Sequence, residues 1–235
     1  LDEVFAEPDL PTDLRQRALR ARALSHLKRG ETDAALADVE EAATLAVSPR
    51  VRQATALEHA QALISAERAE EALTELDGVE PDHPALVIWK ALIVARGEAA
   101  AGRAQEAVRT LDAALEALPR PLPEAPPVEF SLTPWTPVEA AIHATKSLQD
   151  LAPLFVRAEP WTRLLELAPQ DLVAALEAAR ALARGGHEGE AARAWAWAVS
   201  LNGGQAPENA ASHPDLAALE KKRVEGLKAK TSGGR

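Results

Sequence analysis

The sequence contains no cysteine, methionine or tyrosine, and aromatic residues make up only 3% of its 235 residues. Without cysteine the chain forms neither a disulfide nor a thiolate metal site, and it has no cysteine nucleophile. With so few aromatic residues, a chain that is 47% hydrophobic must build its core from alanine, leucine and valine. Such side chains suit closely packed helices, whereas β-sheets are rich in β-branched and aromatic residues. The composition therefore favours an all-α protein.

Positive charge and long apolar runs are also scarce. The 36 acidic residues outnumber the 26 basic ones, which gives a formal net charge of −10 at pH 7. Nucleic-acid phosphates attract basic surfaces, so no nucleic-acid partner is expected. No apolar run is long enough for a membrane span, which needs about 18 residues or more. The cytoplasm is the favoured compartment, and the periplasm would follow if a signal or anchor had been removed.

Sequence signatures of catalysis are missing as well. The chain has no G-x-S-x-G motif, no phosphate-binding loop and no dinucleotide-binding fingerprint. None of the six histidines stands at the spacing of a metal-binding pair. Adjacent carboxylates such as Glu40–Glu41 and Glu70–Glu71 are expected to lie on solvated helix surfaces. We therefore expect no catalytic residue, no metal site and no cofactor, and the protein is predicted not to be an enzyme.

A helical pattern recurs at Gly30, Glu67, Gly102 and Gly186, each of which begins a unit at a tight turn. An alanine stands five residues after the turn, a larger apolar residue four later, and a small or β-branched residue three later again. These positions are Ala35, Val39 and Ala42; Ala72, Leu76 and Val79; Ala107, Leu111 and Ala114; and Ala191, Trp195 and Ala198. Offsets of four and three place them on one helical stripe. A proline or glycine closes each unit, because proline inside a helix costs about 3 kcal/mol.

A second helical stretch precedes each turn, so the repeating unit is helix, turn, helix. The first three turns, at residues 30, 67 and 102, are 37 and 35 residues apart. A hairpin of this length cannot bury its apolar side alone and must stack on a neighbour. The pattern resembles the tetratricopeptide-repeat (TPR) family. That resemblance implies a right-handed superhelix of antiparallel helix hairpins, with a peptide or protein segment bound in its concave groove and a role in assembling larger complexes.

The resemblance also implies a domain organisation. Three TPR-like repeats are expected at 13–119, and a second helical segment at 138–229, with a degenerate repeat, one good repeat and a C-terminal capping helix. Between them, the proline-rich segment 120–137 is expected to be an extended linker, partly polyproline II. Residues 230–235 are expected to be a flexible tail. Thr136, Pro137 and Glu139 have the spacing of a helix N-cap, which predicts that helix restarts there.

Basic residues gather on the first helix of the predicted hairpins, which lines the concave side in proteins of this kind. Arginine binds carboxylates through two parallel hydrogen bonds, so an acidic or carboxylate-ended peptide is the predicted partner. The candidate peptide-binding residues are Arg20, Lys28, Trp89, Arg96, Arg180 and Arg184. In the alternative interpretation, these arginines pair with acids of neighbouring helices.

The aromatic residues of the proline-rich segment leave two further alternatives. Phe130 and Trp135 must dock somewhere, either as a clamp on the adjoining helices or in the concave groove. In the second case the segment 120–137 fills the groove itself. The chain would then be a regulatory or targeting domain of a larger enzymatic or membrane-anchored protein.

Overall fold

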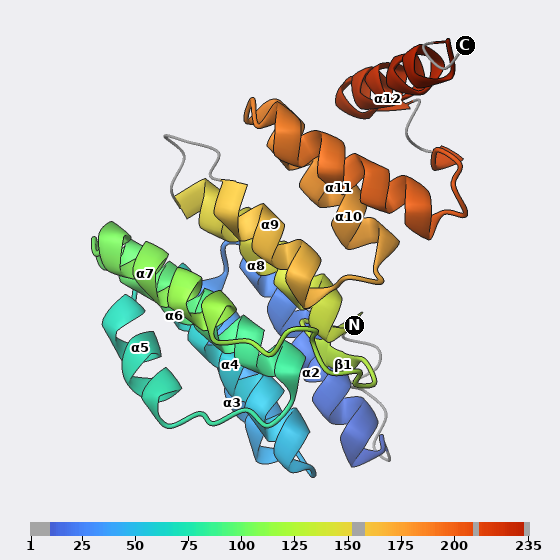
Figure 1. Cartoon of the computed structure of the whole chain (residues 1–235). Coiled ribbons are helices and arrows are strands. Elements are labelled where there is room, and N and C mark those ends of the chain that lie inside the picture. Colours follow the sequence, from blue (N-terminus) through green and yellow to red (C-terminus); the bar gives the residue numbers. More distant parts are fainter. Residues whose placement is uncertain (1–9, 152–157, 209–211, 233–235) are drawn as a thin grey trace. The chain divides into compact units, whose positions relative to one another are not determined.

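The computed structural model describes residues 10–151, 158–208 and 212–232, and helices make up most of them (Figure 1). The first six helices are α2 (Thr12–Arg29), α3 (Thr32–Thr44), α4 (Pro49–Ser65), α5 (Ala69–Asp77), α6 (Pro84–Ala100) and α7 (Ala104–Glu116). Two short strands, β1 (Val128–Phe130) and β2 (Thr133–Trp135), follow them. The later helices are α8 (Pro137–Leu151), α9 (Ala158–Leu167), α10 (Leu172–Arg184), α11 (Glu188–Leu201) and α12 (Pro214–Ser232). The predicted all-α fold class is confirmed.

The chain divides into two compact units. Unit 1 comprises the described residues up to Ala117 together with Pro123–Ala144, and unit 2 comprises Leu118–Leu122 and the described residues from Thr145 onwards. The segment expected to be a linker is thus shared between the units, and most of it folds with unit 1. Part of this extended segment also pairs with itself, as described below.

Three helix hairpins, α2/α3, α4/α5 and α6/α7, build unit 1. Each turn needs a residue in the left-handed conformation, and Gly30 (φ 75°) and Gly102 (φ 80°) adopt it without steric cost. Glu67, which stands where a glycine is missing, is held at φ 61°. At the first turn the N–H of Glu31 reaches back to the carbonyl of His26 at 3.0 Å, which closes the end of α2.

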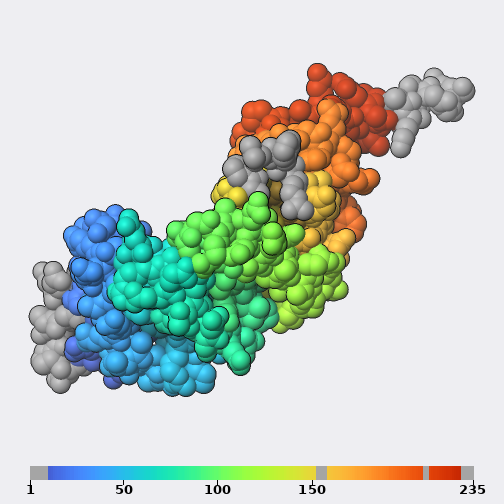
Figure 2. All heavy atoms as spheres, turned by 90° about the vertical axis from the view of Figure 1, so that its left-hand side faces the viewer, coloured from blue at the N-terminus to red at the C-terminus, as the bar shows by residue number. Residues whose placement is uncertain are grey.

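The predicted apolar stripe lies in the core. Ala35, Ala72, Ala107 and Ala191 are fully buried, and Trp195 is 1% exposed. Eleven of the twelve stripe positions are buried, and Ala114 is half-buried. Successive hairpins stack, since α3 packs against α4 and α5 against α6. On the outer surface of unit 1, α5 and α7 lie next to each other (Figure 2), joined by an ion pair between Glu70 and Arg103. The predicted TPR-like helix-hairpin repeat is confirmed.

Within the extended proline-rich segment, residues 128–135 form a β-hairpin, which was not predicted from the sequence. β1 and β2 are antiparallel, and Ser131 and Leu132 form the turn with φ of 48° and 61°. Two positive φ values match the turn type that suits the twist of a hairpin. The sequence alternates to fit, because Val128 and Phe130 are buried and the intervening Glu129 is partly exposed. The prediction from the sequence considered only the many prolines of this segment and did not use the alternation of apolar and polar residues at 128–130.

The predicted start of α8 is confirmed in atomic detail. The hydroxyl of Thr136 accepts the N–H of Glu139 at 3.2 Å, and the Glu139 carboxylate accepts the N–H of Thr136 at 2.8 Å. This reciprocal pair is a capping box, with Pro137 in the first turn where its missing N–H costs nothing.

Among the described residues, unit 2 contains the end of α8 from Thr145, helix α9, the hairpin α10/α11 and the terminal helix α12, and α9 packs against α10. Gly186 (φ 77°) makes the α10/α11 turn. α12 buries Leu216 and Leu219 and is tied to α10 by an ion pair between Arg184 and Asp215 at 2.8 Å. Its outer side is charged, as a terminal helix facing water requires. The helix continues to Ser232, so it includes the first residues of the predicted tail, and 233–235 lie outside the described residues.

Candidate functional site

The β1–β2 hairpin packs on the side of unit 1 formed by the first helices α2, α4 and α6, here called the first-helix face. Arg20 of α2 is at the centre of this contact. Its Nε and Nη2 donate to the two carboxylate oxygens of Glu58 on α4, both at 2.7 Å. Its Nη1 donates to Oε1 of Glu129 on β1 at 2.9 Å, and Arg17 reaches the other Glu129 oxygen at 3.0 Å. The Ser131 N–H donates to Glu58 at 2.6 Å.

This ion cluster is largely removed from water. Arg20 is 5% exposed and Glu58 is 8% exposed. Burial acts to lower the pKa of Arg20, but the hydrogen bonds and negative charges of Glu58 and Glu129 together raise it above its usual value. Arg20 therefore stays charged and requires a carboxylate beside it. Burying such an ion pair costs desolvation energy, so the pair adds little net stability. What it does is specify which side chains of the hairpin and the helices contact each other.

Aromatic rings form the second part of the contact. Trp89 of α6 is 5% exposed, and its ring centroid lies 4.5 Å from that of Phe130, 4.9 Å from Trp135 and 5.0 Å from His143. Nε2 of His143 is in turn 3.4 Å from Nη2 of Arg96. The indole N–H of Trp89 is buried and finds no hydrogen-bond acceptor among the described residues. The docked hairpin therefore covers this donor without supplying an acceptor for it.

His83, just before α6, fixes the chain that leads into the hairpin. Its Nδ1 accepts the N–H of Ala85 at 3.2 Å, so its Nε2 carries the proton that is donated to the carbonyl of Pro126 at 2.9 Å. The residue is only 2% exposed. This bond holds the segment before β1 against unit 1.

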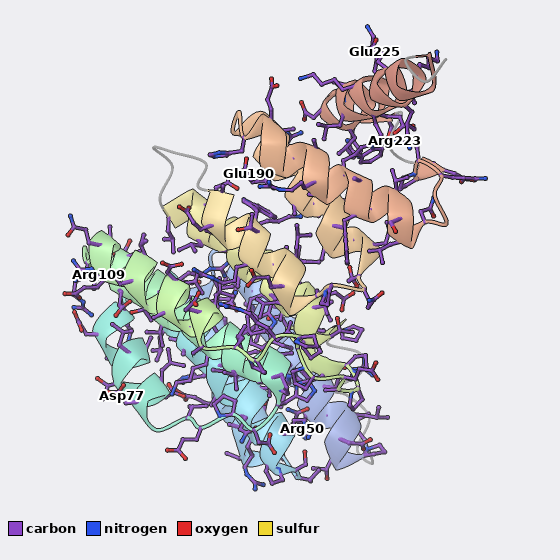
Figure 3. The ribbon with its side chains drawn as sticks, viewed as in Figure 1. Arg50, Asp77, Arg109, Glu190, Arg223 and Glu225 are labelled. Carbon is purple, nitrogen blue, oxygen red and sulfur yellow. The ribbon has the colours of Figure 1, made fainter. Side chains whose placement is uncertain are left out.

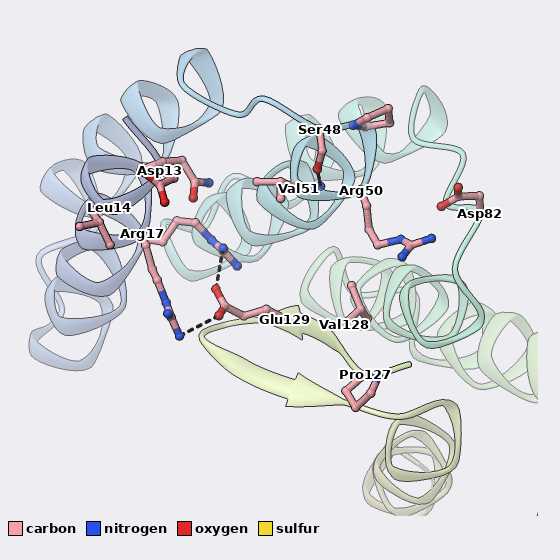
Figure 4. A pocket seen from close by; sticks show the side chains of 13 residues that line it. Asp13, Leu14, Arg17, Ser48, Arg50, Val51, Asp82, Pro127, Val128 and Glu129 are labelled. Carbon is pink, nitrogen blue, oxygen red and sulfur yellow. Dashed lines mark hydrogen bonds and ion pairs between the residues drawn. The ribbon is translucent and has the colours of Figure 1, made fainter. Parts of the chain in front are cut away.

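A pocket of about 610 Å³ lies beside the hairpin in unit 1 (Figure 4). Its walls are the start of α2, the first turn of α4, Asp82 and residues 127–129. Arg50 is exposed at this pocket and has no ion-pair partner within the described ranges. Asp13 and Asp82 also line it, so both signs of charge are present.

Four of the six predicted peptide contacts lie in unit 1. Arg20 and Trp89 both touch the hairpin, and Arg96 lies beside His143 in the same aromatic group. Lys28 is exposed near the end of α2, and the structure assigns it no partner among the residues it describes.

The other two predicted contacts lie in unit 2. Arg184 pairs with Asp215 of α12, which is the neighbouring-helix pairing that the alternative interpretation expected. Arg180 on α10 is partly buried, and its Nε has no hydrogen-bond partner in the described part of the chain.

Three residues of the site were not identified from the sequence. Glu58 looks like any helix-surface acid until Arg20 is placed against it. Glu129 could have been identified, because an acidic residue between two apolar ones is the alternating pattern that predicts a half-buried β-strand. Arg50 stands at the start of a helix, and only the docked hairpin turns that position into the wall of a pocket.

Metal binding and membrane insertion find no support in the described parts of the chain. Across residues 10–151, 158–208 and 212–232, no group of three or more histidine or carboxylate side chains could hold a metal ion. In the same ranges, no helix combines the length and the apolar character needed to cross a bilayer.

The fold and site together define a helical-repeat protein built of TPR-like hairpins. No family model matches the sequence, and no curated protein matches it either. Among solved structures, the chain is similar to the nearly identical TPR-like repeats of a kinesin light chain-like protein from Podosopora anserina. The identity is 18%, the TM-score is 0.45, and the match covers 80% of this chain and 95% of that one. It is also similar to a MamA mutant, with 19% identity and a TM-score of 0.36, and the match covers 86% of this chain and 99% of that one.

Proposed function

We propose that this chain is a non-catalytic protein-interaction module whose first-helix face in unit 1 receives an acidic peptide segment of a partner protein. The supporting observation is that the chain's own acid, Glu129, rests there on Arg17 and Arg20. Two arginines that hold one carboxylate from a separate segment are the chemistry such a ligand needs.

The unfilled part of this face is the pocket with Arg50, which is where we place the partner segment. Each hydrogen bond to a charged group contributes about 1.5–3 kcal/mol, so a few of them in a preformed pocket suffice for a micromolar site. Of the contacts proposed from the sequence, Arg20 holds the hairpin that forms one wall. Lys28 and Arg96 remain proposed contacts farther along the face. Trp89 is covered by the hairpin and remains a proposed contact for the second candidate function below, in which the hairpin leaves.

In unit 2, Arg180 and Arg184 remain proposed contacts for a second part of the same partner. Arg180 is the stronger candidate, because its buried Nε lacks an acceptor among the described residues. Arg184 would have to leave Asp215, so its contribution is expected to be smaller.

A positional-scanning library of acetylated, amidated octapeptides tests the proposal by fluorescence polarisation on the intact chain. We expect Asp or Glu to be selected over Asn or Gln at one position. Arg50→Glu should weaken the selected peptide at least tenfold. Arg109→Glu makes the same charge change on α7, well away from Arg50 in Figure 3, and should leave binding unaltered. Selection without an acid, or equal effects of the two variants, would overturn the proposal.

A second candidate function is favoured by the burial of Phe130 and by the Glu129 ion pairs. Here the hairpin is itself the occupant of the groove, and the chain is a regulatory or targeting domain of a larger protein, opened when the hairpin leaves. Replacing residues 127–136 by a flexible Gly-Ser linker separates the two. The regulatory function predicts tighter peptide binding after the replacement, whereas the first proposal predicts that binding is lost with the pocket wall.

A further inference from the structure

The two edges of the β-hairpin are not equivalent. Its residue pairs are Val128–Trp135, Glu129–Pro134 and Phe130–Thr133. Opposite pairs in an antiparallel ladder alternate between hydrogen-bonded and non-hydrogen-bonded. The tight two-residue turn makes the pair next to it a hydrogen-bonded one. Glu129 and Pro134 therefore form the non-hydrogen-bonded pair, and their backbone groups point away from the hairpin on opposite edges.

Only one of these edges can accept another strand. Pro134 has no N–H, and proline on an edge strand blocks further pairing. Glu129 keeps both its N–H and its carbonyl, and neither is hydrogen-bonded within the described residues. The next N–H on this side, that of Ser131, already donates to Glu58 of α4 at 2.6 Å. The open edge of β1 therefore faces α4.

The pocket runs along this open edge. Pro127, Val128 and Glu129 line it, and no residue of β2 does. The first turn of α4 and the start of α2 form the facing walls, as Figure 4 shows. A volume of about 610 Å³ falls in the range of ordinary ligand sites, roughly 300–1,000 Å³. Three backbone groups, the Pro127 carbonyl and both groups of Glu129, are thus available beside an open space.

We propose that β1 accepts a third strand: an extended segment of the partner protein pairs with residues 127–129 inside the pocket and places one acidic side chain on Arg50. This inference rests on the proposed function and specifies its binding mode. Backbone hydrogen bonds supply affinity in such strand addition, and the side-chain pockets supply specificity. Asp13 and Asp82 repel further negative charge, so the preferred segment carries a single acid among uncharged residues.

The test uses the octapeptide selected from the library, remade with one backbone N-methyl group at each position in turn. We expect alternate N-methyl peptides, those whose N–H faces β1, to lose at least tenfold in affinity. The intervening ones should bind as before. On the protein, Glu129→Pro should abolish binding because it removes the N–H from the open edge. Pro134→Val changes the closed edge and should have no effect.

The outcomes separate the binding mode from the function. Equal binding by all N-methyl peptides would overturn strand addition and leave the proposed function standing. Tighter binding after replacement of residues 127–136 would also overturn it, in favour of a displaced hairpin. If Glu129→Pro unfolds the hairpin, the N-methyl series on the unaltered chain still decides. A library that selects no acid would remove the proposed function together with the inference.

Discussion

Glu58 links the docked hairpin to α2 and α4, because it accepts hydrogen bonds from both Arg20 and Ser131. Glu58→Gln keeps the shape of the side chain but removes its charge and one of its acceptor oxygens. Removing one partner of a buried ion pair costs about 3–5 kcal/mol. Glu129 still compensates part of the Arg20 charge, so we expect the lower end, about 3 kcal/mol.

Urea unfolding followed by far-UV circular dichroism measures this loss as a lower midpoint with an unchanged slope. Glu41→Gln is the matched control, because Glu41 also pairs with an arginine of α2, Arg15, but the two side chains are 42% and 49% exposed. Exposed pairs contribute at most about 1 kcal/mol. If the two variants shifted the midpoint equally, the buried cluster would contribute no more to the stability of unit 1 than an exposed ion pair does, which contradicts this prediction.

Three further predictions concern the turns, one histidine and the hairpin. Glu67→Gly should raise stability by about 0.5–1 kcal/mol in urea unfolding, because it relieves a positive φ that costs roughly 1–2 kcal/mol, less the entropy that glycine adds to the unfolded chain. His59 donates to Glu75 at 2.6 Å and lies near Glu40, and the hydrogen bond to Glu75 raises the pKa of His59 above its usual 6.5. The stability that protonated His59 contributes is therefore fully present below pH 6.5, and it is lost as the pH rises through the raised pKa of His59 in the folded chain. Over that pH range the urea midpoint should fall in the parent chain but not in His59→Gln. Phe130→Ala should release the hairpin, which limited proteolysis would detect as new cleavage between residues 118 and 136.

Each of these has a result that contradicts it. Gly102→Ala should destabilise the chain by about 1 kcal/mol. If Gly102→Ala and Glu67→Gly changed the stability in the same direction, the positive φ at the turns would not be the cause of either change. An identical pH profile in His59→Gln would assign the titration to other groups. Unchanged protease resistance in Phe130→Ala would mean that the ion cluster alone holds the hairpin.

The helix hairpins could be predicted from the sequence because local signals agree with one another. A turn glycine, an alanine five residues later and a closing proline each act over a few residues, and the stripe at Ala35, Val39 and Ala42 needs no knowledge of distant contacts. Thr136 and Glu139 likewise specify the start of α8 by themselves. These local preferences predict the folded structure correctly because tertiary packing favours the same helices and turns.

The candidate site depends on long-range contacts, which the sequence pattern does not contain. Arg20 meets Glu58 and Glu129 across 38 and 109 residues of chain, respectively. The sequence shows the basic residues of the first helices, but it does not show their partners. Arg184 shows the consequence, since a residue chosen as a peptide contact pairs with an acid of α12.

Amide hydrogen exchange, measured by NMR on Ser131 and Glu129, shows whether the hairpin is docked through Glu58 and whether the open edge of β1 pairs with a bound peptide. We expect the Ser131 N–H to be protected by Glu58, while the Glu129 N–H on the open edge exchanges quickly until the selected peptide is added and then slows. A Ser131 amide that exchanges as fast as an unstructured chain, or a Glu129 amide that is unaffected by bound peptide, would contradict this expectation.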